Sequence, residues 1–446
     1  MSERSGGGIG RLIDILFLAM LAAAAVPTLA LARLLVRRFG PATRDVMVSM
    51  TADSIAETRR LNSPSSVERF YTREPFDLTY VVHVGVGPAG ATRLGRKVVG
   101  VEAAVPVPRW CVRWLPRTAR ALIELAGIAV GIRLLRRTGG NVCEVMSPSA
   151  LVPRALLLKT LSGCRLTTQV RGNVDLLSYS LGTYFYCRIR RGGLVGRLLA
   201  GAVHRIIIEG FFRRCDLIVG YNLNNLQSAI SNGADPRCSR LSRIAVDRTI
   251  LEAPQVPRGD LKGFPQDGRV ILLWSRLGAE KYVREAVEAF VCLAPPLPDV
   301  RLVMIGDGPL LQALIARAHD AGLAERILFL GYRDRSYIRS AAQFSDVALV
   351  PYGGSSLVEA VLLGLPVVAF DIEWHAELVR PGETGHLADF SDAAHMAAQL
   401  GAALNDPQDS ARMALACRQT AEHMFDSERV LREERRYYAA LTRSAA

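Results

Sequence analysis

The sequence predicts an α/β fold made of two Rossmann-like domains that face each other across an interdomain cleft. Short apolar runs alternate with helical stretches along most of the chain, which is typical of parallel sheets covered by helices. Residues 251–268 hold three prolines and three glycines, a composition typical of a linker. The length of 446 residues suits two or three domains of about 150 residues each.

The alternation also sets the expected boundaries. We expect a membrane anchor or apolar helix over residues 1–38, an N-terminal domain over 45–250, the linker over 251–268, a C-terminal domain over 269–425 and a final helix over 426–446. The expected strands of the first domain are Val46–Met50, Leu78–Val84, Lys97–Ala104, Val142–Met146, Arg165–Val170 and Leu217–Gly220. Those of the second domain are Val270–Trp274, Arg301–Ile305, Ile327–Leu330, Val347–Val350 and Val367–Phe370.

The N-terminal segment is apolar enough to cross a membrane. Leu12–Ala32 spans 21 residues and contains one charged residue, Asp14; about 20 apolar residues cross a hydrocarbon core of about 30 Å. Four arginines follow the run and two precede it, so the positive-inside rule places the rest of the chain in the cytosol. We therefore expect an anchor over 12–36 in the cytoplasmic membrane, with the catalytic domains facing the cytosol. A buried helix of the first domain is the alternative.

A second apolar stretch, Ala119–Leu135, has arginines at both ends and Glu124 near its middle. The carboxylate argues against a second span. Two interpretations stay open: a helix that lies on the bilayer face with its arginines at the head groups, and an ordinary amphipathic helix of the domain.

The charge of the chain is unevenly distributed. Residues 1–250 carry 35 Lys+Arg against 16 Asp+Glu, a balance of +19, whereas residues 251–446 carry 20 against 26, a balance of −6. A basic half favours an anionic partner such as a membrane surface. No RNP motif, zinc finger or block rich in lysine and arginine is present, so we expect no nucleic acid.

Cofactor and metal signatures are absent from the sequence. The eight cysteines are scattered and none forms a C-x-x-C pair, which argues against zinc and iron–sulfur sites and fits a reducing cytosol. Gly85–Gly90 matches G-x-G-x-x-G, but another expected strand follows it instead of a helix, so we interpret it as a turn between strands. We expect no cofactor.

Two motifs of the C-terminal half suit an anionic ligand. Arg276 and Lys281 follow the expected strand Val270–Trp274, where two cations can converge on one anion, or remain solvated surface charges. Gly353–Leu357 precedes an apolar helix, so its N–H groups can point at a phosphate. Glu359 stands alone among apolar residues of that helix and needs a hydrogen-bonding partner, either a sugar diol or an internal group.

Segments of residues 270–405 together resemble glycosyltransferase family 4, the glycosyl transferases group 1 family with the GT-B fold. The segments are SRLGAEK, AVEAF, RLVMIGDGP, ERILFLGY, DVALVPY, SSLVEAVLLGLPVVAFD and AELVRPGETGHL, in the order of the family. The resemblance is fainter in the N-terminal half, in TTQVRGN and CDLIVGYN. It implies a retaining, metal-independent transfer of a sugar from a nucleotide-sugar donor to a lipid-linked or polysaccharide acceptor, in the synthesis of bacterial cell-surface glycans.

The resemblance also implies roles for individual residues. Arg276 and Lys281 would bind the diphosphate leaving group and thereby serve catalysis. Glu359 would hold the ribose hydroxyls, and Tyr332 and Arg333 would flank the base. The loop that would offer N–H groups to the phosphates is Gly353, Gly354, Ser355, Ser356 and Leu357, and the N-terminal side of the cleft would be Arg171, Gly172 and Asn173.

At three points the chain departs from the pattern of the family. Pro351 stands where the family usually has a glutamate that touches the donor sugar, eight residues before Glu359, and Arg171 stands where a histidine is common. The early glycine-rich loop is also missing after the first strand. These departures leave two alternatives: a non-catalytic scaffold that binds nucleotide sugars, and a nucleotide-sugar epimerase of similar architecture.

Overall fold

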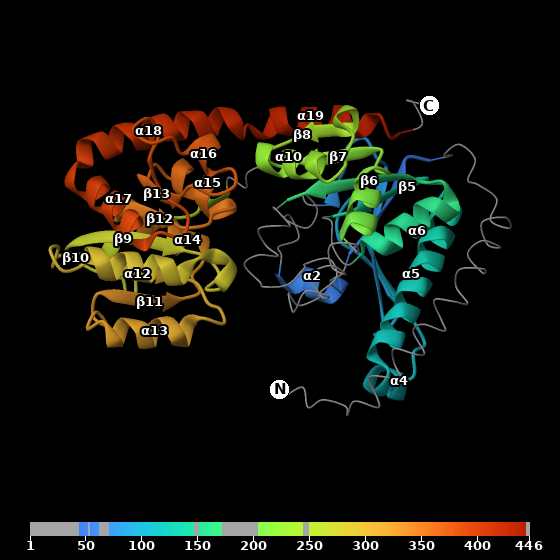
Figure 1. Ribbon diagram of the computed structural model, residues 1–446, viewed down its shortest axis with the longest axis horizontal. Coiled ribbons are helices and arrows are strands. Elements are labelled where there is room, and N and C mark those ends of the chain that lie inside the picture. The colour runs from blue at the N-terminus through green and yellow to red at the C-terminus, as the bar shows by residue number, and fades with distance from the viewer. Residues whose placement is uncertain are drawn as a thin grey trace. The chain divides into compact units, whose positions relative to one another are not determined.

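The computed structural model describes residues 44–51, 54–61, 71–146, 151–171, 204–243 and 249–442. These residues form two compact units (Figure 1). Of the described residues, unit 1 holds those up to Ser242 and those from Leu431 onward, and unit 2 holds Arg243–Val430. The N-terminal segment expected to be an anchor, residues 12–36, lies outside the described residues. None of the helices in the described part of the chain combines the length and the apolar character that a membrane span needs.

Unit 1 is built on an eight-stranded sheet in the order β3-β4-β2-β1-β5-β6-β7-β8. The strands are β1 Val46–Met50, β2 Leu78–Gly85, β3 Gly90–Arg93, β4 Val98–Ala104, β5 Val142–Val145, β6 Arg165–Val170, β7 Leu217–Gly220 and β8 Ser239–Leu241. All neighbours are parallel except β3, which runs antiparallel to β4. The glycine motif at residues 85–90 joins β2 to β3, and no helix opens there.

Helices cover this sheet because its central strands are apolar on both faces. On one face, Val48 and Met50 of β1 pack with α5 and α6; on the other, Met47 packs with Phe76 and Tyr438. The described helices of unit 1 before its C-terminal helix are α2 Ile55–Leu61, α4 Arg109–Trp114, α5 Pro116–Thr138, α6 Val152–Ser162, α9 Gly210–Phe212 and α10 Leu223–Ser231, with a π-helix at His204–Glu209.

Helix α5 contains the second apolar stretch and is part of the core of unit 1. Its residues Ile128 and Leu135 are buried against α6 and the sheet. Glu124 pairs with Arg154 of α6, with 2.9 Å between Oε2 and Nε. The structure therefore gives α5 the arrangement of an ordinary domain helix, and Figure 1 shows α4 at the end of α5 remote from α6.

The C-terminal helix α19, Ser427–Ala439, contributes a buried residue to unit 1. The fully buried Glu144 of β5 accepts hydrogen bonds at Oε1 from Arg73 Nε at 3.3 Å and from the Tyr438 hydroxyl at 3.0 Å. Gln169 Nε2 adds a third at 3.3 Å, and the Ser49 hydroxyl donates to Oε2 at 3.0 Å. Because Tyr438 belongs to α19, these bonds attach that helix to the sheet of unit 1.

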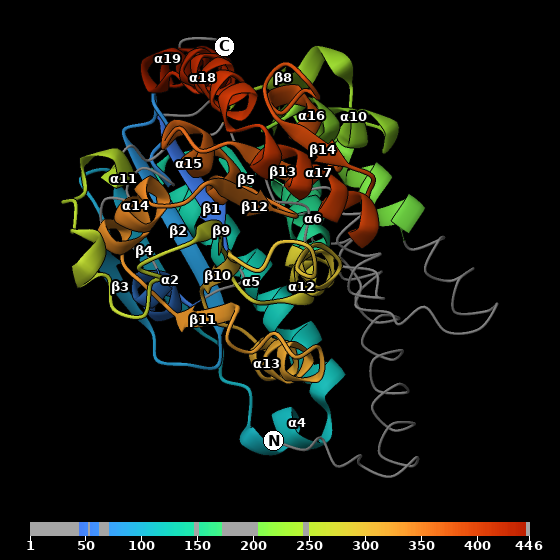
Figure 2. The same ribbon diagram turned by 90° about the vertical axis from the view of Figure 1, so that its left-hand side faces the viewer.

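Unit 2 is built on a parallel six-stranded sheet in the order β11-β10-β9-β12-β13-β14. The strands are β9 Arg269–Trp274, β10 Val300–Ile305, β11 Ile327–Gly331, β12 Val347–Val350, β13 Val367–Phe370 and β14 His386–Ala388. Its helices are α11 Thr249–Glu252, α12 Val283–Leu293, α13 Leu311–Asp320, α14 Arg335–Gln343, α15 Ser355–Leu362, α16 His375–Leu378, α17 Ala393–Asn405 and α18 Pro407–Met424. In Figure 2, α14 and α15 lie on one side of these strands and α12, α13 and α17 on the other.

The segment expected to be a linker, residues 251–268, packs within unit 2. Leu261 and Phe264 are buried in the main core of this unit, and the backbone N–H of Val256 donates to Ser340 Oγ at 2.7 Å. The prolines and glycines of this segment therefore allow an irregular backbone that packs on the core of unit 2.

Candidate functional site

Two glycines bring the loops after β9 and β10 into contact at the carboxyl edge of the unit 2 sheet. Gly306 has a φ of +137°, and a Cβ built on it would lie 1.9 Å from the carbonyl oxygen of Ser275. A Cβ on Gly308 would lie 2.4 Å from the carbonyl oxygen of Leu277. The N–H of Leu277 donates to the carbonyl of Asp307 at 2.9 Å. The Gly306–Gly308 turn therefore supports the backbone that carries Arg276.

The two expected cations come from this one loop but have different surroundings. The Arg276 side chain is 70% exposed and pairs with Glu280, with 3.5 Å between Nη1 and Oε1. The Lys281 ammonium lies 4.9 Å from the centroid of the Tyr352 ring, and burial lowers its pKa below the ordinary value for lysine. Arg276 is thus available to a ligand from solvent, whereas Lys281 is held against the loop that follows β12.

Lys281 lies beside a cluster of aromatic rings and a carboxylate. The rings of Tyr282 and Tyr352 have centroids 6.0 Å apart in an edge-on arrangement, and Phe390 lies 5.1 Å from Tyr282. The Tyr352 hydroxyl is hydrogen bonded to Glu373, and burial together with this carboxylate raises the pKa of Tyr352. Glu373 also opposes the fall in the pKa of Lys281. Glu373, which comes from the loop after β13, is not among the residues expected from the sequence.

His375 fixes the backbone of the glycine loop after β12. Its Nδ1 donates to the carbonyl of Phe370 at 2.8 Å, and its Nε2 accepts the N–H of Gly353 at 3.1 Å. The side chain is fully buried, and this burial lowers its pKa to about 4, so the imidazole is neutral near pH 7. The N–H of Gly353 is therefore engaged inside the protein, and Gly354, Ser355, Ser356 and Leu357 provide the remaining N–H groups of the expected loop.

Glu359 lies on α15 and is oriented by the last residue of β9. Trp274 Nε1 donates to Glu359 Oε2 at 3.0 Å, and Trp274 is 7% exposed. A neutral donor stabilises the carboxylate in place without neutralising its charge. Trp274 is thus an internal hydrogen-bonding partner of Glu359, which was one of the two alternatives expected from the sequence. The side chain of Glu359 is still partly exposed. No spacing rule would have identified Trp274, because its contact arises from the pairing of β9 with β12.

Tyr332 and Arg333, the pair expected to flank the base, follow β11, which is an edge strand of the unit 2 sheet. Tyr332 is 80% exposed, and the Arg333 guanidinium lies 5.1 Å from the Tyr337 ring centroid. A solvent-facing aromatic beside a stacked guanidinium provides a surface on which a planar base can stack. Parallel strands end at one edge, so this pair, Glu359 and the loop of Arg276 share the carboxyl edge of the unit 2 sheet.

In unit 1, the structure describes one of the three expected site residues. Arg171 follows β6, its Nε donates to Gln169 Oε1 at 2.9 Å, and its guanidinium lies 5.2 Å from the Tyr221 ring centroid. Gly172 and Asn173 lie outside the described residues. Among the residues that the structure does describe, no group of three or more His, Cys, Asp or Glu side chains could hold a metal ion.

The two α/β units with their parallel sheets have the architecture of the GT-B glycosyltransferases. Sucrose-phosphate synthase from Thermosynechococcus elongatus matches with a TM-score of 0.64 at 16% identity, over 90% of this chain and 100% of that one. The Anabaena protein HepE, solved with UDP and glucose, matches with a TM-score of 0.61 at 14% identity, over 89% of this chain and 99% of that one. These likenesses confirm the predicted fold.

The family resemblance is confirmed within unit 2. Residues 261–420 match the glycosyl transferases group 1 family. Phosphatidyl-myo-inositol mannosyltransferase of Mycobacterium leprae is 34% identical over 164 residues, which are 35% of this chain and 42% of that protein. The chain spans about half the length, or less, of the curated relatives it matches. The matched segment contains the residues that surround Arg276, Lys281 and Glu359.

Proposed function

We propose that this protein is a retaining, metal-independent glycosyltransferase that moves a sugar from a nucleotide-sugar donor to a lipid-linked or polysaccharide acceptor. The observation that carries the proposal is the hydrogen bond from Trp274 to Glu359, which presents a carboxylate at the carboxyl edge of the sheet, in the segment that matches the family. A charged carboxylate held in this way is a strong acceptor for the paired hydroxyls of a ribose. The likeness to HepE, which was solved with UDP and glucose, supports a nucleotide-sugar donor.

The two cations after β9 would stabilise the leaving group. When the bond between the anomeric carbon and the diphosphate breaks, negative charge develops on the phosphate oxygens, and cations fixed before the reaction stabilise it. Arg276 is exposed to solvent and can close on the diphosphate, whereas Lys281 is already held by Tyr352. The N–H groups from Gly354 to Leu357, at the start of α15, would complete the phosphate site.

A scaffold that binds the donor without transferring it is the second candidate, because Pro351 is buried where the family usually has a glutamate. Incubation with UDP-, GDP- and ADP-sugars and a lipid extract separates the two. Transfer gives a labelled glycolipid whose new linkage, by NMR, keeps the anomeric configuration of the donor. Tight binding without release of nucleoside diphosphate would instead establish the scaffold.

We also propose that the chain is held at the cytoplasmic membrane, with its catalytic units on the cytosolic side. The apolar run at residues 12–36 and the balance of +19 in residues 1–250 support this location. Cell fractionation of the full chain is the test. Recovery with the membranes after a high-salt wash is expected, and recovery in the supernatant before any wash contradicts the proposal.

A further inference from the structure

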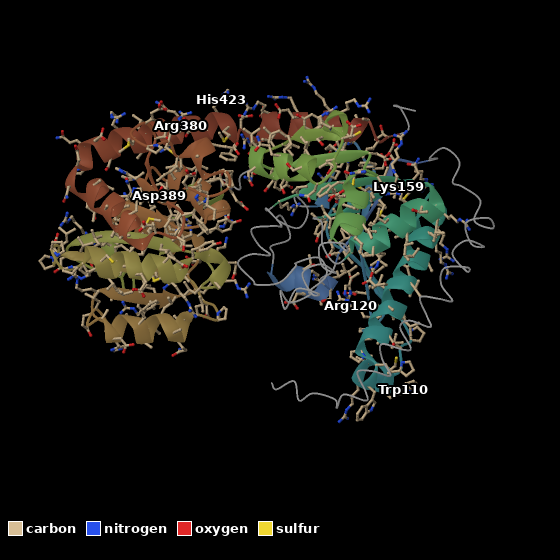
Figure 3. All side chains as sticks on the ribbon, in the orientation of Figure 1. Trp110, Arg120, Lys159, Arg380, Asp389 and His423 are labelled. Carbon is tan, nitrogen blue, oxygen red and sulfur yellow. The ribbon has the colours of Figure 1, made fainter. Side chains whose placement is uncertain are left out.

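Two tryptophans of the short helix α4 point to a surface outside the candidate site. Trp110 and Trp114 are 60% and 62% exposed, and their spacing of four residues places them on one face of the helix. The other two tryptophans of the chain, Trp274 and Trp374, are buried in unit 2. Figure 3 shows Trp110 on α4, at the end of α5. Large aromatic side chains exposed in this way indicate a binding surface.

An apolar groove adjoins α4. It has a volume of about 680 Å³, and Val112 and Arg113 of α4 line one part of it. The remaining lining residues are Val86, Ala104, Val105, Pro106 and Val107. Val86 and Val112 are themselves largely exposed. The two exposed tryptophans and the groove thus meet at the same short helix, and we call them together the α4 surface.

The sequence of α4 and of the start of α5 carries charge of one sign. Residues 105–123 contain four arginines, Arg109, Arg113, Arg117 and Arg120, and no aspartate or glutamate. The next acidic residue, Glu124, is paired with Arg154. The Arg113 guanidinium lies 5.6 Å from the centroid of the Trp114 ring. This concentration of positive charge would repel a second copy of the same surface and complements an anionic one.

We propose that the α4 surface docks onto an anionic lipid bilayer. Indole rings favour the depth of the lipid head groups, where their apolar body and their N–H are both satisfied. Arg113 and Arg120 then reach lipid phosphates, while the groove receives the apolar region just below the head groups. The six residues of α4 are too few to span, so the contact is interfacial. This inference rests on the proposed function, because a lipid-linked acceptor lies in such a bilayer.

Tryptophan fluorescence of the full-length protein tests this contact. Vesicles of phosphatidylglycerol and phosphatidylcholine should shift the emission to the blue, and brominated lipids should quench it, whereas phosphatidylcholine alone should do neither. Because Trp274 and Trp374 are already buried, the change reports on Trp110 and Trp114. A variant with both Trp110→Phe and Trp114→Phe should lose the response, which assigns the signal. Residues 12–36 can hold the chain on a vesicle by themselves, so the readout is lipid contact of these indoles and not binding alone.

Two matched charge-reversal variants distinguish docking by the α4 surface from a general electrostatic attraction of the protein to the vesicle. At a saturating concentration of vesicles, Arg113→Glu with Arg120→Glu should lower the ratio of lipid-contacting to solvent-exposed indoles about 25-fold, at about fivefold for each arginine near an anionic surface. Arg133→Glu with Arg137→Glu, both exposed farther along α5, should change it little.

Three outcomes would overturn the proposal: indoles that stay accessible to acrylamide on vesicle-bound protein, equal effects of both reversals, and an emission already blue-shifted without vesicles. The last would mean that the chain itself or a second copy covers α4. Donor turnover, measured separately without vesicles, decides the proposed function independently.

Discussion

The indole Nε1 of Trp274 and the carboxylate Oε2 of Glu359 lie 3.0 Å apart and form a hydrogen bond between the end of β9 and helix α15. Strand β9 pairs directly with β12, and α15 follows β12 after a loop of a few residues. The pairing of β9 with β12, together with the short connection from β12 to α15, therefore determines where this carboxylate lies. In the proposed donor site, nucleotide affinity depends on both members of the pair.

A double-mutant cycle on this pair should show strong coupling. Hydrogen bonds to charged groups contribute about 1.5–3 kcal/mol, so Trp274→Phe should lower the affinity for the nucleoside diphosphate by misplacing Glu359. Glu359→Gln should lower it directly. Isothermal titration of both single variants and the double variant measures the coupling. Additive losses would mean that Trp274 supports only the core.

Loss of either cation should slow donor turnover more than it weakens binding. Removing one preorganised electrostatic group costs about 2–4 kcal/mol of transition-state stabilisation. Arg276→Ala and Lys281→Met should therefore lower kcat/KM by about 30- to 1000-fold. Arg284→Ala, on the exposed side of α12 nearby, is the matched control. Rates equal to those of the control would remove these two residues from the reaction.

Protonation of His375 should destabilise unit 2 in acid. Burial lowers the pKa of this imidazole to about 4, whereas an unfolded histidine titrates near 6.5. The native state therefore keeps this imidazole neutral. Its contribution to the free energy of unfolding is complete above pH 6.5 and is lost as the pH falls towards 4. The loss reaches about 3 kcal/mol. Thermal unfolding at several pH values should show a steeper acid dependence for the native chain than for His375→Asn. Parallel curves would contradict the assignment.

Substitution of Gly306 should displace the loop that carries Arg276. A Cβ there would meet the Ser275 carbonyl oxygen, and the φ of +137° is strained for any other residue. Gly306→Ala should lower the free energy of unfolding by about 1–3 kcal/mol and should also lower donor turnover. At Gly259, by comparison, a Cβ would meet nothing within 4 Å. Gly259→Ala should leave the unfolding temperature and the turnover unchanged; equal losses in both variants would be contrary to this explanation.

The strands were predictable because buried parallel strands are continuous apolar runs. Each expected strand is present within one residue at either end. Three strands were not expected from the sequence, and all three are short edge strands with few apolar residues: Gly90–Arg93, Ser239–Leu241 and His386–Ala388. Their pairing depends on a neighbour that local sequence does not reveal.

The candidate site was predictable only in part. Arg276 and Glu359 stand in recognisable motifs, but Trp274, Glu373 and His375 act through contacts between separate loops. The neutral state of His375, for example, follows from its burial against Phe370 and Gly353. Such contacts arise from the order of the strands in the sheet, which the sequence motifs do not contain.

The central claim is that Glu359 belongs to a nucleotide-sugar site that turns over. The most direct test is the initial rate of nucleoside diphosphate release from a panel of UDP-, GDP- and ADP-sugars. It compares the native chain, Glu359→Gln and the control Glu288→Gln, an acid that pairs with Arg317 elsewhere in unit 2. We expect one donor to be turned over by the native chain and the control, and at least tenfold more slowly by Glu359→Gln. Equal rates in all three proteins, or no release from any donor, would contradict the account.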